Sequence, residues 1–152
     1  MYKIICIGKI KEKYLIDGIN EYKKRIEGYT KFEIVELKEI NTLDVSKNIE
    51  NEGKSILEKI RKEDYIITLE ILGNKLDSVA FSKHLEKITT YGTSNIVFII
   101  GGSNGLSDDV KRRSNYKLSF SDMTFPHQLM RLILVEQIYR SLTILNNKEY
   151  HK

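Results

Sequence analysis

The segment NIVFIIGGSNG, residues 95–105, joins the most apolar run of the chain to a glycine-rich turn. Uninterrupted isoleucine-rich runs are typical of strands buried on both faces, as in a parallel sheet covered by helices. Such sheets place ligand-binding loops directly after a buried strand, where glycine lets the backbone approach a ligand and frees N–H groups to point at it. The segment therefore predicts a buried strand followed by a candidate binding loop, the alternative being a tight structural turn.

Strand and helix signals alternate along the rest of the chain. Apolar runs predict strands, whereas apolar residues at steps of three and four predict amphipathic helices. The predicted strands cover residues 4–7, 32–37, 65–71, 95–100 and 116–120, with a turn at residues 73–75. The predicted helices cover residues 15–29, 46–60 with Ser46 as cap, 78–91, a short segment begun by Ser107, and 127–146. This order predicts an α/β fold, a parallel sheet flanked by helices, and a single domain of residues 1–152.

The composition is that of one water-soluble folded domain: 152 residues, 41% hydrophobic and 30% charged. The 25 basic and 21 acidic residues give a formal net charge of +4, a mild excess that is compatible with a polyanionic partner. The single cysteine, Cys6, lies in an apolar run, which excludes an internal disulfide and favours a buried thiol. No apolar run has the length of a signal peptide or membrane span, so we expect no membrane partner and a cytoplasmic location.

The last predicted helix, residues 127–146, is apolar around nearly its whole circumference. A surface helix on a monomer needs only one apolar stripe. A helix that is apolar on both sides must bury both, and in a chain this short a second subunit is the expected cover. The helix therefore predicts a symmetric homodimer.

Ionisable residues interrupt this helix. His127 follows Pro126 at its predicted first turn, where free backbone N–H groups favour anions. Arg131, Glu136 and Arg140 break the apolar surface, and Glu136 with Arg140 has the spacing of an ion pair on one helix face. Two interpretations stay open: a structural histidine with a local ion pair, or a polar cleft at the subunit interface that retains these charges.

Two further patterns predict no site. His84, His127 and His151 have no metal-ligand spacing with one another or with Cys6, so no metal is expected. The GKS sequence at residues 53–55 is similar to the end of a phosphate loop, but it lacks the upstream glycine and lies within a predicted helix.

Four motifs occur in order along the chain and together carry a resemblance to a known family. They are IIGGSNGL at residues 99–106, LSFSDMTFPH at residues 118–127, the run from Arg131 to Arg140 with EQIYR at residues 136–140, and the terminal YHK at residues 150–152. The whole chain resembles the bacterial ribosomal RNA large subunit methyltransferase H family. These are SPOUT-class enzymes that use S-adenosylmethionine to methylate N3 of a pseudouridine in large-subunit ribosomal RNA.

The resemblance implies a C-terminal trefoil knot, although knots are almost absent from proteins. It also implies that backbone and apolar side chains of three loops in the knot hold S-adenosylmethionine, with no metal. The implied cofactor-binding residues are Leu69, Gly101, Phe120, Ser121, Asp122, Met123, Thr124 and Phe125.

The resemblance further implies an active site between the knot of one subunit and the terminal residues of the other. The implied catalytic residues are His127, Arg140, Tyr150 and His151. Arg140 suits contact with an RNA phosphate or a developing anion, and Tyr150 suits stacking or orientation of the base. His127 or His151 suits removal of the N3 proton.

Recognition of the substrate is expected to depend on shape. With a net charge of only +4 and no separate RNA-binding domain, phosphate contacts alone give little affinity. We therefore expect both subunits to recognise an assembled ribosomal surface, with Lys9, Lys11, Lys13 and the cluster at residues 111–113 as candidate contacts. The alternative function is a non-catalytic dimeric ribosome-binding or RNA-binding factor that keeps the fold and the pocket.

Overall fold

All five strands run parallel in one sheet in the computed structural model, which describes residues 1–152. The strands are β1 (Tyr2–Ile7), β2 (Phe32–Leu37), β3 (Tyr65–Lys75), β4 (Ile96–Ile100) and β5 (Tyr116–Ser119). Their order across the sheet is β2-β1-β4-β3-β5. The parallel α/β fold expected from the sequence is confirmed.

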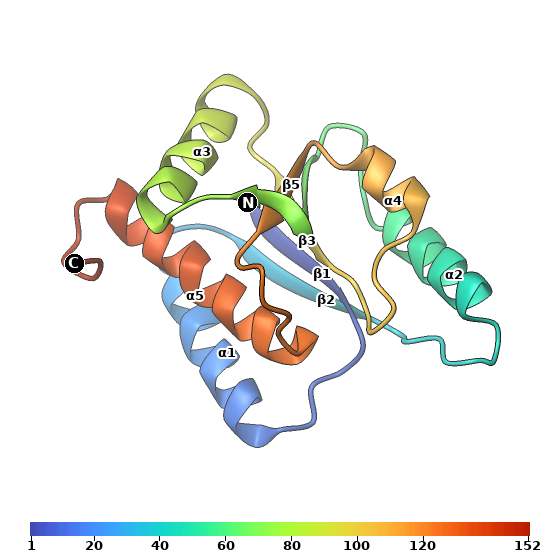
Figure 1. Ribbon diagram of the computed structural model, residues 1–152. Helices are drawn as coiled ribbons and strands as arrows, with labels where there is room; N and C mark the ends of the chain where they lie inside the picture. The colour runs from blue at the N-terminus through green and yellow to red at the C-terminus, as the bar shows by residue number, and fades with distance from the viewer.

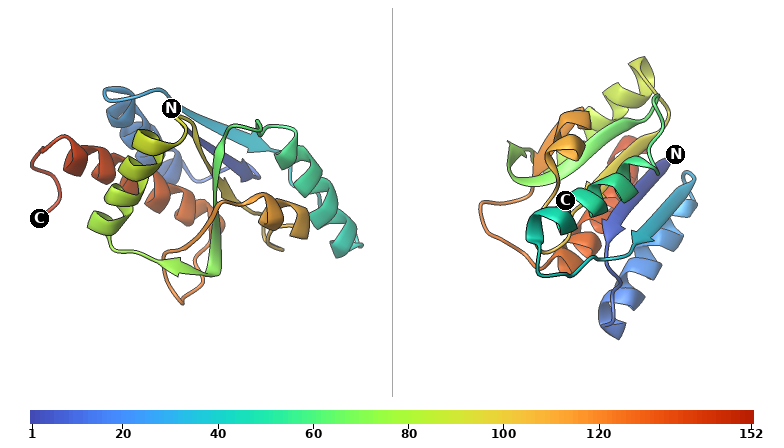
Figure 2. Two further views of the ribbon diagram at one scale, coloured as in Figure 1. Left: turned by 90° about the horizontal axis from the view of Figure 1, so that it is seen from above. Right: turned by 90° about the vertical axis from the view of Figure 1, so that its right-hand side faces the viewer.

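Helices cover both faces of the sheet (Figure 1). One face carries α1 (Lys13–Glu27), α3 (Ser78–Tyr91) and α5 (His127–Leu145), and the other carries α2 (Val45–Leu57) and α4 (Asp108–Arg113). Figure 2 shows the sheet between these two layers. α5 lies between α1 and α3 and contacts both. No helix is both long and apolar enough to cross a membrane.

β4 lies at the centre of the sheet, and all five of its residues are buried. Phe98 pairs with Ile4 of β1 on one side and with Ile67 of β3 on the other. Side chains of β4 alternate between the two faces, so that Phe98 packs in the larger apolar cluster and Ile99 in the smaller one. Because parallel strands point the same way, the carboxyl ends of β3, β4 and β5 meet at one edge of the sheet.

Two local predictions were wrong. The N-cap of α2 is Asp44, whose carboxylate accepts a hydrogen bond from the backbone N–H of Lys47 at 3.1 Å, and not Ser46. The predicted turn at residues 73–75 belongs to β3 instead: Leu118 of β5 pairs first with Leu69 and again with Asn74, and the intervening residues form a bulge. Long-range pairing with β5 therefore overrides the turn preference of the local sequence.

Two polar side chains confirm or correct interpretations of the core. Cys6 is fully buried, as expected from its apolar run, and burial raises the pKa of its thiol to about 12. Arg131 of α5 is also buried, and its guanidinium pairs with Glu36 at 2.6 Å and donates to the Gly8 carbonyl at 3.0 Å. The charge of Arg131 is therefore paired within one chain and needs no subunit cleft, although its Nε has no hydrogen-bond partner.

Gly53 occupies the point where α2 comes closest to α4. A β-carbon at Gly53 would lie 2.2 Å from the Ser107 Oγ and 2.8 Å from its Cβ. Ser107 is held there because its hydroxyl caps α4, accepting from the Val110 N–H at 3.3 Å. The glycine of the GKS sequence thus serves helix packing.

Gly53→Ala should lower the free energy of unfolding by about 1–3 kcal/mol, the usual cost of overpacking a buried contact. Gly18→Ala on α1 is the matched control, because its new β-carbon meets only the flexible end of Leu132 at 3.1 Å. Its gain in helix propensity, about 1 kcal/mol, should offset that contact. Urea denaturation measures both variants, and equal stability of the two would contradict the proposed close approach.

Candidate functional site

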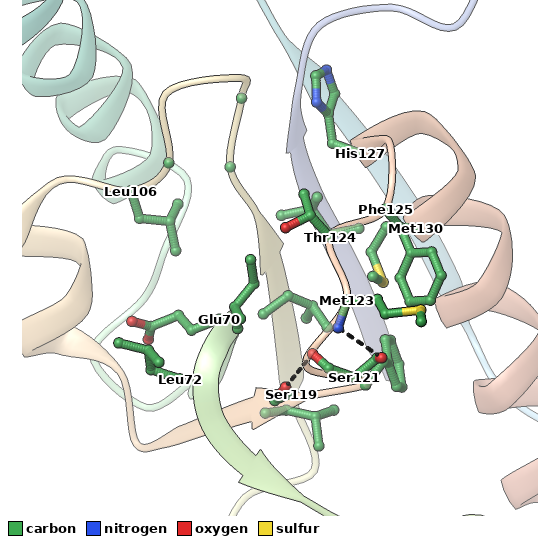
Figure 3. Close-up of a pocket in the computed structure, with 18 of the residues that line it drawn as sticks. Glu70, Leu72, Leu106, Ser119, Ser121, Met123, Thr124, Phe125, His127 and Met130 are labelled. Atoms are coloured by element: carbon green, nitrogen blue, oxygen red, sulfur yellow. Dashed lines mark hydrogen bonds between the residues drawn. The ribbon is translucent and has the colours of Figure 1, made fainter.

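A cavity of about 380 Å³ opens at the carboxyl edge of β3, β4 and β5. Half of its 20 lining residues are hydrophobic. They come mainly from three segments, namely residues 69–72 at the bulge of β3, residues 100–106 from the last residue of β4 onward, and residues 118–125 from the end of β5 onward. Figure 3 shows Thr124, Phe125 and Met130 on one side and Leu72 and Leu106 on the other. This position is where open α/β sheets bind ligands.

Seven of the eight residues expected to bind a cofactor line this cavity. They are Leu69, Gly101, Phe120, Ser121, Met123, Thr124 and Phe125. Asp122 does not line it; its carboxylate is largely exposed and pairs with Lys75 of β3. That ion pair joins the segment after β5 to the bulged end of β3. Asp122 can therefore affect the cavity only by holding these two segments together.

The turn after β4 requires glycine for packing. A β-carbon at Gly101 would lie 3.0 Å from the Leu106 Cδ2 and 3.1 Å from the carbonyl of Gly105. Gly105 adopts a φ of +86°, which favours glycine, and its N–H donates to the Gly102 carbonyl at 3.1 Å. A side chain at Gly101 would thus displace the loop that forms one wall of the cavity.

Hydrogen bonds between residues close in sequence shape the opposite wall. The Ser119 hydroxyl donates to the Ser121 carbonyl at 3.1 Å, and the Ser121 hydroxyl accepts from the Met123 N–H at 3.0 Å (Figure 3). These bonds fold the segment after β5 back on itself. As a result Met123 is largely exposed at the rim, while Phe125 turns into the cavity.

His127 stands at the rim of the cavity, in the first turn of α5 (Figure 3). An acidic group of α2 lies near His127: Glu52 is buried and accepts a hydrogen bond from the Ile40 N–H at 2.9 Å. Burial raises the pKa of Glu52, the Ile40 hydrogen bond and the His127 charge lower it, and Glu39 raises it. His127 is therefore the one expected catalytic residue that the single chain places at the cavity.

The other three expected catalytic residues form a cluster at the far end of α5. The Tyr150 hydroxyl donates to Glu136 at 2.9 Å, and Arg140 also donates to Glu136. The Arg140 guanidinium lies 4.8 Å from the Tyr150 ring centroid and 3.1 Å from the His151 Nδ1. The C-terminal segment is therefore held against its own helix by a hydrogen-bonded network.

This network constrains the hydrogen-bonding roles of two groups. Burial, followed by hydrogen bonds to Tyr22 and Glu136, raises the pKa of Tyr150, so its phenol is a proton donor at neutral pH. Because arginine can only donate, His151 Nδ1 must accept from Arg140, and the ring proton then lies on Nε2. His151 thus presents a donor through Nε2, whereas the single O–H of Tyr150 is already bound to Glu136.

Within one chain, the cavity and the C-terminal cluster are far apart. His127 and Arg140 are thirteen positions apart on the continuous helix α5, which corresponds to about 20 Å along its axis. Figure 1 shows the C-terminus beyond the far end of that helix. The structure therefore brings together Arg140, Tyr150 and His151 but separates them from His127.

The basic cluster at residues 111–113 divides into three separate environments. Arg113 donates to the backbone carbonyls of Arg61 and Asp64, both at 3.0 Å, and so closes the loop before β3. Arg112 pairs with Asp109 on its own helix. Only Lys111 lines the cavity. The cluster does not form one phosphate-binding surface.

The chain is similar to known methyltransferases along its whole length. Residues 1–151 match the family described as "Predicted SPOUT methyltransferase". A protein of Streptococcus thermophilus named ribosomal RNA large subunit methyltransferase H is 53% identical over 99% of this chain and 98% of its own. Its namesake from Enterococcus faecalis is 48% identical with the same coverage. Ribosomal RNA large subunit methyltransferase H 1 of Clostridium perfringens is 48% identical over 98% of both chains.

Sequence reasoning missed Tyr22, which links α1 to the C-terminal segment. Its hydroxyl lies 3.3 Å from that of Tyr150, and since Tyr150 donates to Glu136, Tyr22 is the donor between them. The apolar periodicity of α1 accounts for the position of the Tyr22 ring, so nothing in the pattern signals the hydrogen bond.

Tyr22→Phe should loosen the C-terminal segment without unfolding the chain, because it removes only that hydroxyl. Loss of one hydrogen bond should speed amide hydrogen exchange at residues 148–152 by about two- to tenfold. Tyr29→Phe is the matched control: its ring contacts Tyr139 as Tyr22 does, but its hydroxyl makes no hydrogen bond to the C-terminal segment. Equal exchange in the two variants would refute the anchoring role of Tyr22.

Proposed function

The chain belongs to the SPOUT methyltransferase family, among the ribosomal RNA large subunit methyltransferases H, and on this basis we propose that it methylates N3 of a pseudouridine in large-subunit ribosomal RNA with S-adenosylmethionine as donor. One observation carries the proposal: the segments expected to hold the cofactor converge on one cavity. Its volume is within the range of about 300–1,000 Å³ typical of small-molecule sites.

The cavity fits the proposed cofactor chemically. Adenine needs backbone N–H and C=O groups and apolar surfaces, and the walls supply Leu69, Phe125 and the backbone of residues 100–105. Gly101 keeps one wall clear of side chains. When bound, S-adenosylmethionine supplies an electrophilic methyl group on a sulfonium. The chain must then orient the acceptor nitrogen and take up its proton.

We assign the removal of that proton to His127. Methylation of N3 releases a proton, which requires a base or a path to water. His127 stands at the cavity rim, whereas the geometry around Arg140 makes His151 a donor through Nε2. Arg140 and His151 would donate hydrogen bonds to the base or phosphate and stabilise negative charge that develops on the pyrimidine ring. Tyr150, whose O–H is bound to Glu136, would stack on the base or orient it.

A homodimer reconciles these roles, because the chemistry needs both groups of residues in one cleft. One side of α5 carries three partly exposed apolar residues, Leu129, Ile133 and Ile144. Arg140 lies on the same stripe of the helix. A second copy packed on this stripe would bring its C-terminal cluster toward the cavity of the first.

The trefoil knot and the assembled ribosome as substrate belong to the same proposal. The knot is supported by the sheet order, since β5 lies beyond β3 and the chain leaves β5 beside the bulged end of β3. The single sheet supports one domain over residues 1–152. The scattered basic residues support recognition of a ribosomal surface by shape. An enzyme with this substrate would act in the cytoplasm.

Methyl transfer to ribosomes, together with calorimetric binding of S-adenosylmethionine, tests the function. The wild-type protein should bind the cofactor and methylate a pseudouridine at N3 on intact large subunits. Gly101→Val should abolish binding, because the new side chain collides with Leu106 and Gly105. Circular dichroism and melting check that this variant is folded. Cofactor binding by the wild type without any methyl transfer would favour the non-catalytic RNA-binding factor.

Mixing two inactive variants tests the composite site. One variant carries Gly101→Val, and the other lacks residues 150–152 and should lose about a hundredfold to ten-thousandfold in rate. Randomly paired dimers should recover about a quarter of wild-type activity, since half are mixed and each mixed dimer keeps one intact site. Ile133→Glu in both variants should prevent pairing and recovery. Full activity of the truncated variant alone would refute a role for the C-terminal segment.

A further inference from the structure

The cavity contains two charged side chains without ion-pair partners. Glu70, in the bulge of β3, and Lys111 of α4 both line it, and neither takes part in any ion pair of the structure. His127 is the only other ionisable lining residue and stands at the rim. Glu70 belongs to no motif singled out in the sequence, and Lys111 is the one member of the basic cluster at residues 111–113 that lines the cavity. The chemical steps proposed above use neither residue.

The Glu70 carboxylate is held in place from within the fold. Its Oε2 accepts a hydrogen bond from the Thr68 Oγ1 at 2.7 Å, and Thr68 is fully buried. The Thr68 hydroxyl lies 2.8 Å from the Ser114 Oγ, immediately after α4. The second oxygen, Oε1, has no hydrogen-bond partner. Figure 3 shows Glu70 beside Leu72 and near Leu106, across the cavity from Thr124 and Phe125. Glu70, which lines the cavity, therefore has one carboxylate oxygen held by Thr68 and one without a partner.

Lys111 is likewise without a partner, unlike its two neighbours on α4. Arg112 pairs with Asp109, and Arg113 is bound to backbone carbonyls of the loop before β3. The Lys111 ammonium makes no hydrogen bond within the chain, although the side chain is half-buried. The fully buried Val110 fixes the helix beside it. The cavity thus has an unpaired cation on α4 and an unpaired anion on β3.

A ligand that enters a largely apolar cavity must bring charges that match those already there, because unpaired charges are costly to bury. The adenosine part of S-adenosylmethionine is neutral and suits the apolar and backbone walls. Its amino-acid end carries one ammonium and one carboxylate. We propose that Glu70 and Lys111 form the subsite for this amino-acid end, an inference that rests on the proposed function. Glu70 accepts hydrogen bonds from the ammonium, and Lys111 donates to the carboxylate.

Two ligands whose sulfur is uncharged separate the contribution of this subsite to binding from that of the nucleoside. S-Adenosylhomocysteine has the amino-acid end, whereas 5′-methylthioadenosine has the same nucleoside without it. Calorimetry on the full chain should show that Glu70→Gln and Lys111→Met each weaken S-adenosylhomocysteine binding by about tenfold to a hundredfold, the effect of one charge-assisted hydrogen bond. Binding of 5′-methylthioadenosine should stay within about twofold of wild type. Glu70→Asp should retain part of the affinity that Glu70→Gln loses.

The controls are Glu63→Gln and Arg112→Met, which remove exposed charges outside the cavity and should leave both affinities unchanged. Equal loss of both ligands in Glu70→Gln would make Glu70 a wall of the pocket and refute the subsite. Unchanged S-adenosylhomocysteine affinity in Lys111→Met, with slower methyl transfer, would assign Lys111 to the RNA and also refute it. A wild-type protein that binds neither ligand would instead refute the proposed cofactor itself.

Discussion

The burial of β4 on both faces is the constraint on which the site depends. β1, β3 and the two helical layers enclose β4, so the loop after β4 is the first part of this segment that can meet a ligand, at the carboxyl edge of the sheet. This loop begins at Gly101, where the Leu106 side chain and the Gly105 backbone leave no space for a β-carbon. Parallel pairing brings the ends of β3 and β5 to the same edge. The cavity therefore follows from topology and requires no special set of polar residues.

α5 connects the sheet to the C-terminal cluster and uses its charges differently along its length. Arg131 faces inward and ties the helix to β2 through Glu36 and to the end of β1 through the Gly8 carbonyl. Glu136 and Arg140 face outward and hold Tyr150. A continuous helix keeps a fixed length, so no local rearrangement of the C-terminal segment can carry Arg140 to the cavity of its own chain. The dimer proposed above resolves this separation.

The features that depend on local pattern could be predicted from the sequence, whereas those that depend on distant pairing could not. The helix at residues 78–91 and the strand at 32–37 have their predicted bounds, because the helical periodicity and the apolar run are strong. The extension of β3 past Gly73 depends on β5, more than forty residues later. Tyr22 and Glu70 were missed for the same reason, since their partners or surroundings come from other elements.

The C-terminal cluster and the cavity differ in what they offer a substrate. Arg140 and His151 present hydrogen-bond donors, because arginine only donates and its bond to His151 Nδ1 leaves the ring proton on Nε2, whereas the single O–H of Tyr150 is bound to Glu136. A set of donors stabilises negative charge but cannot remove a proton from a neutral pyrimidine. The cavity side contributes His127, a residue that can accept one. If the two sets face each other across a dimer interface, one subunit provides the base and the other stabilises the anion, so neither subunit alone is a complete catalyst.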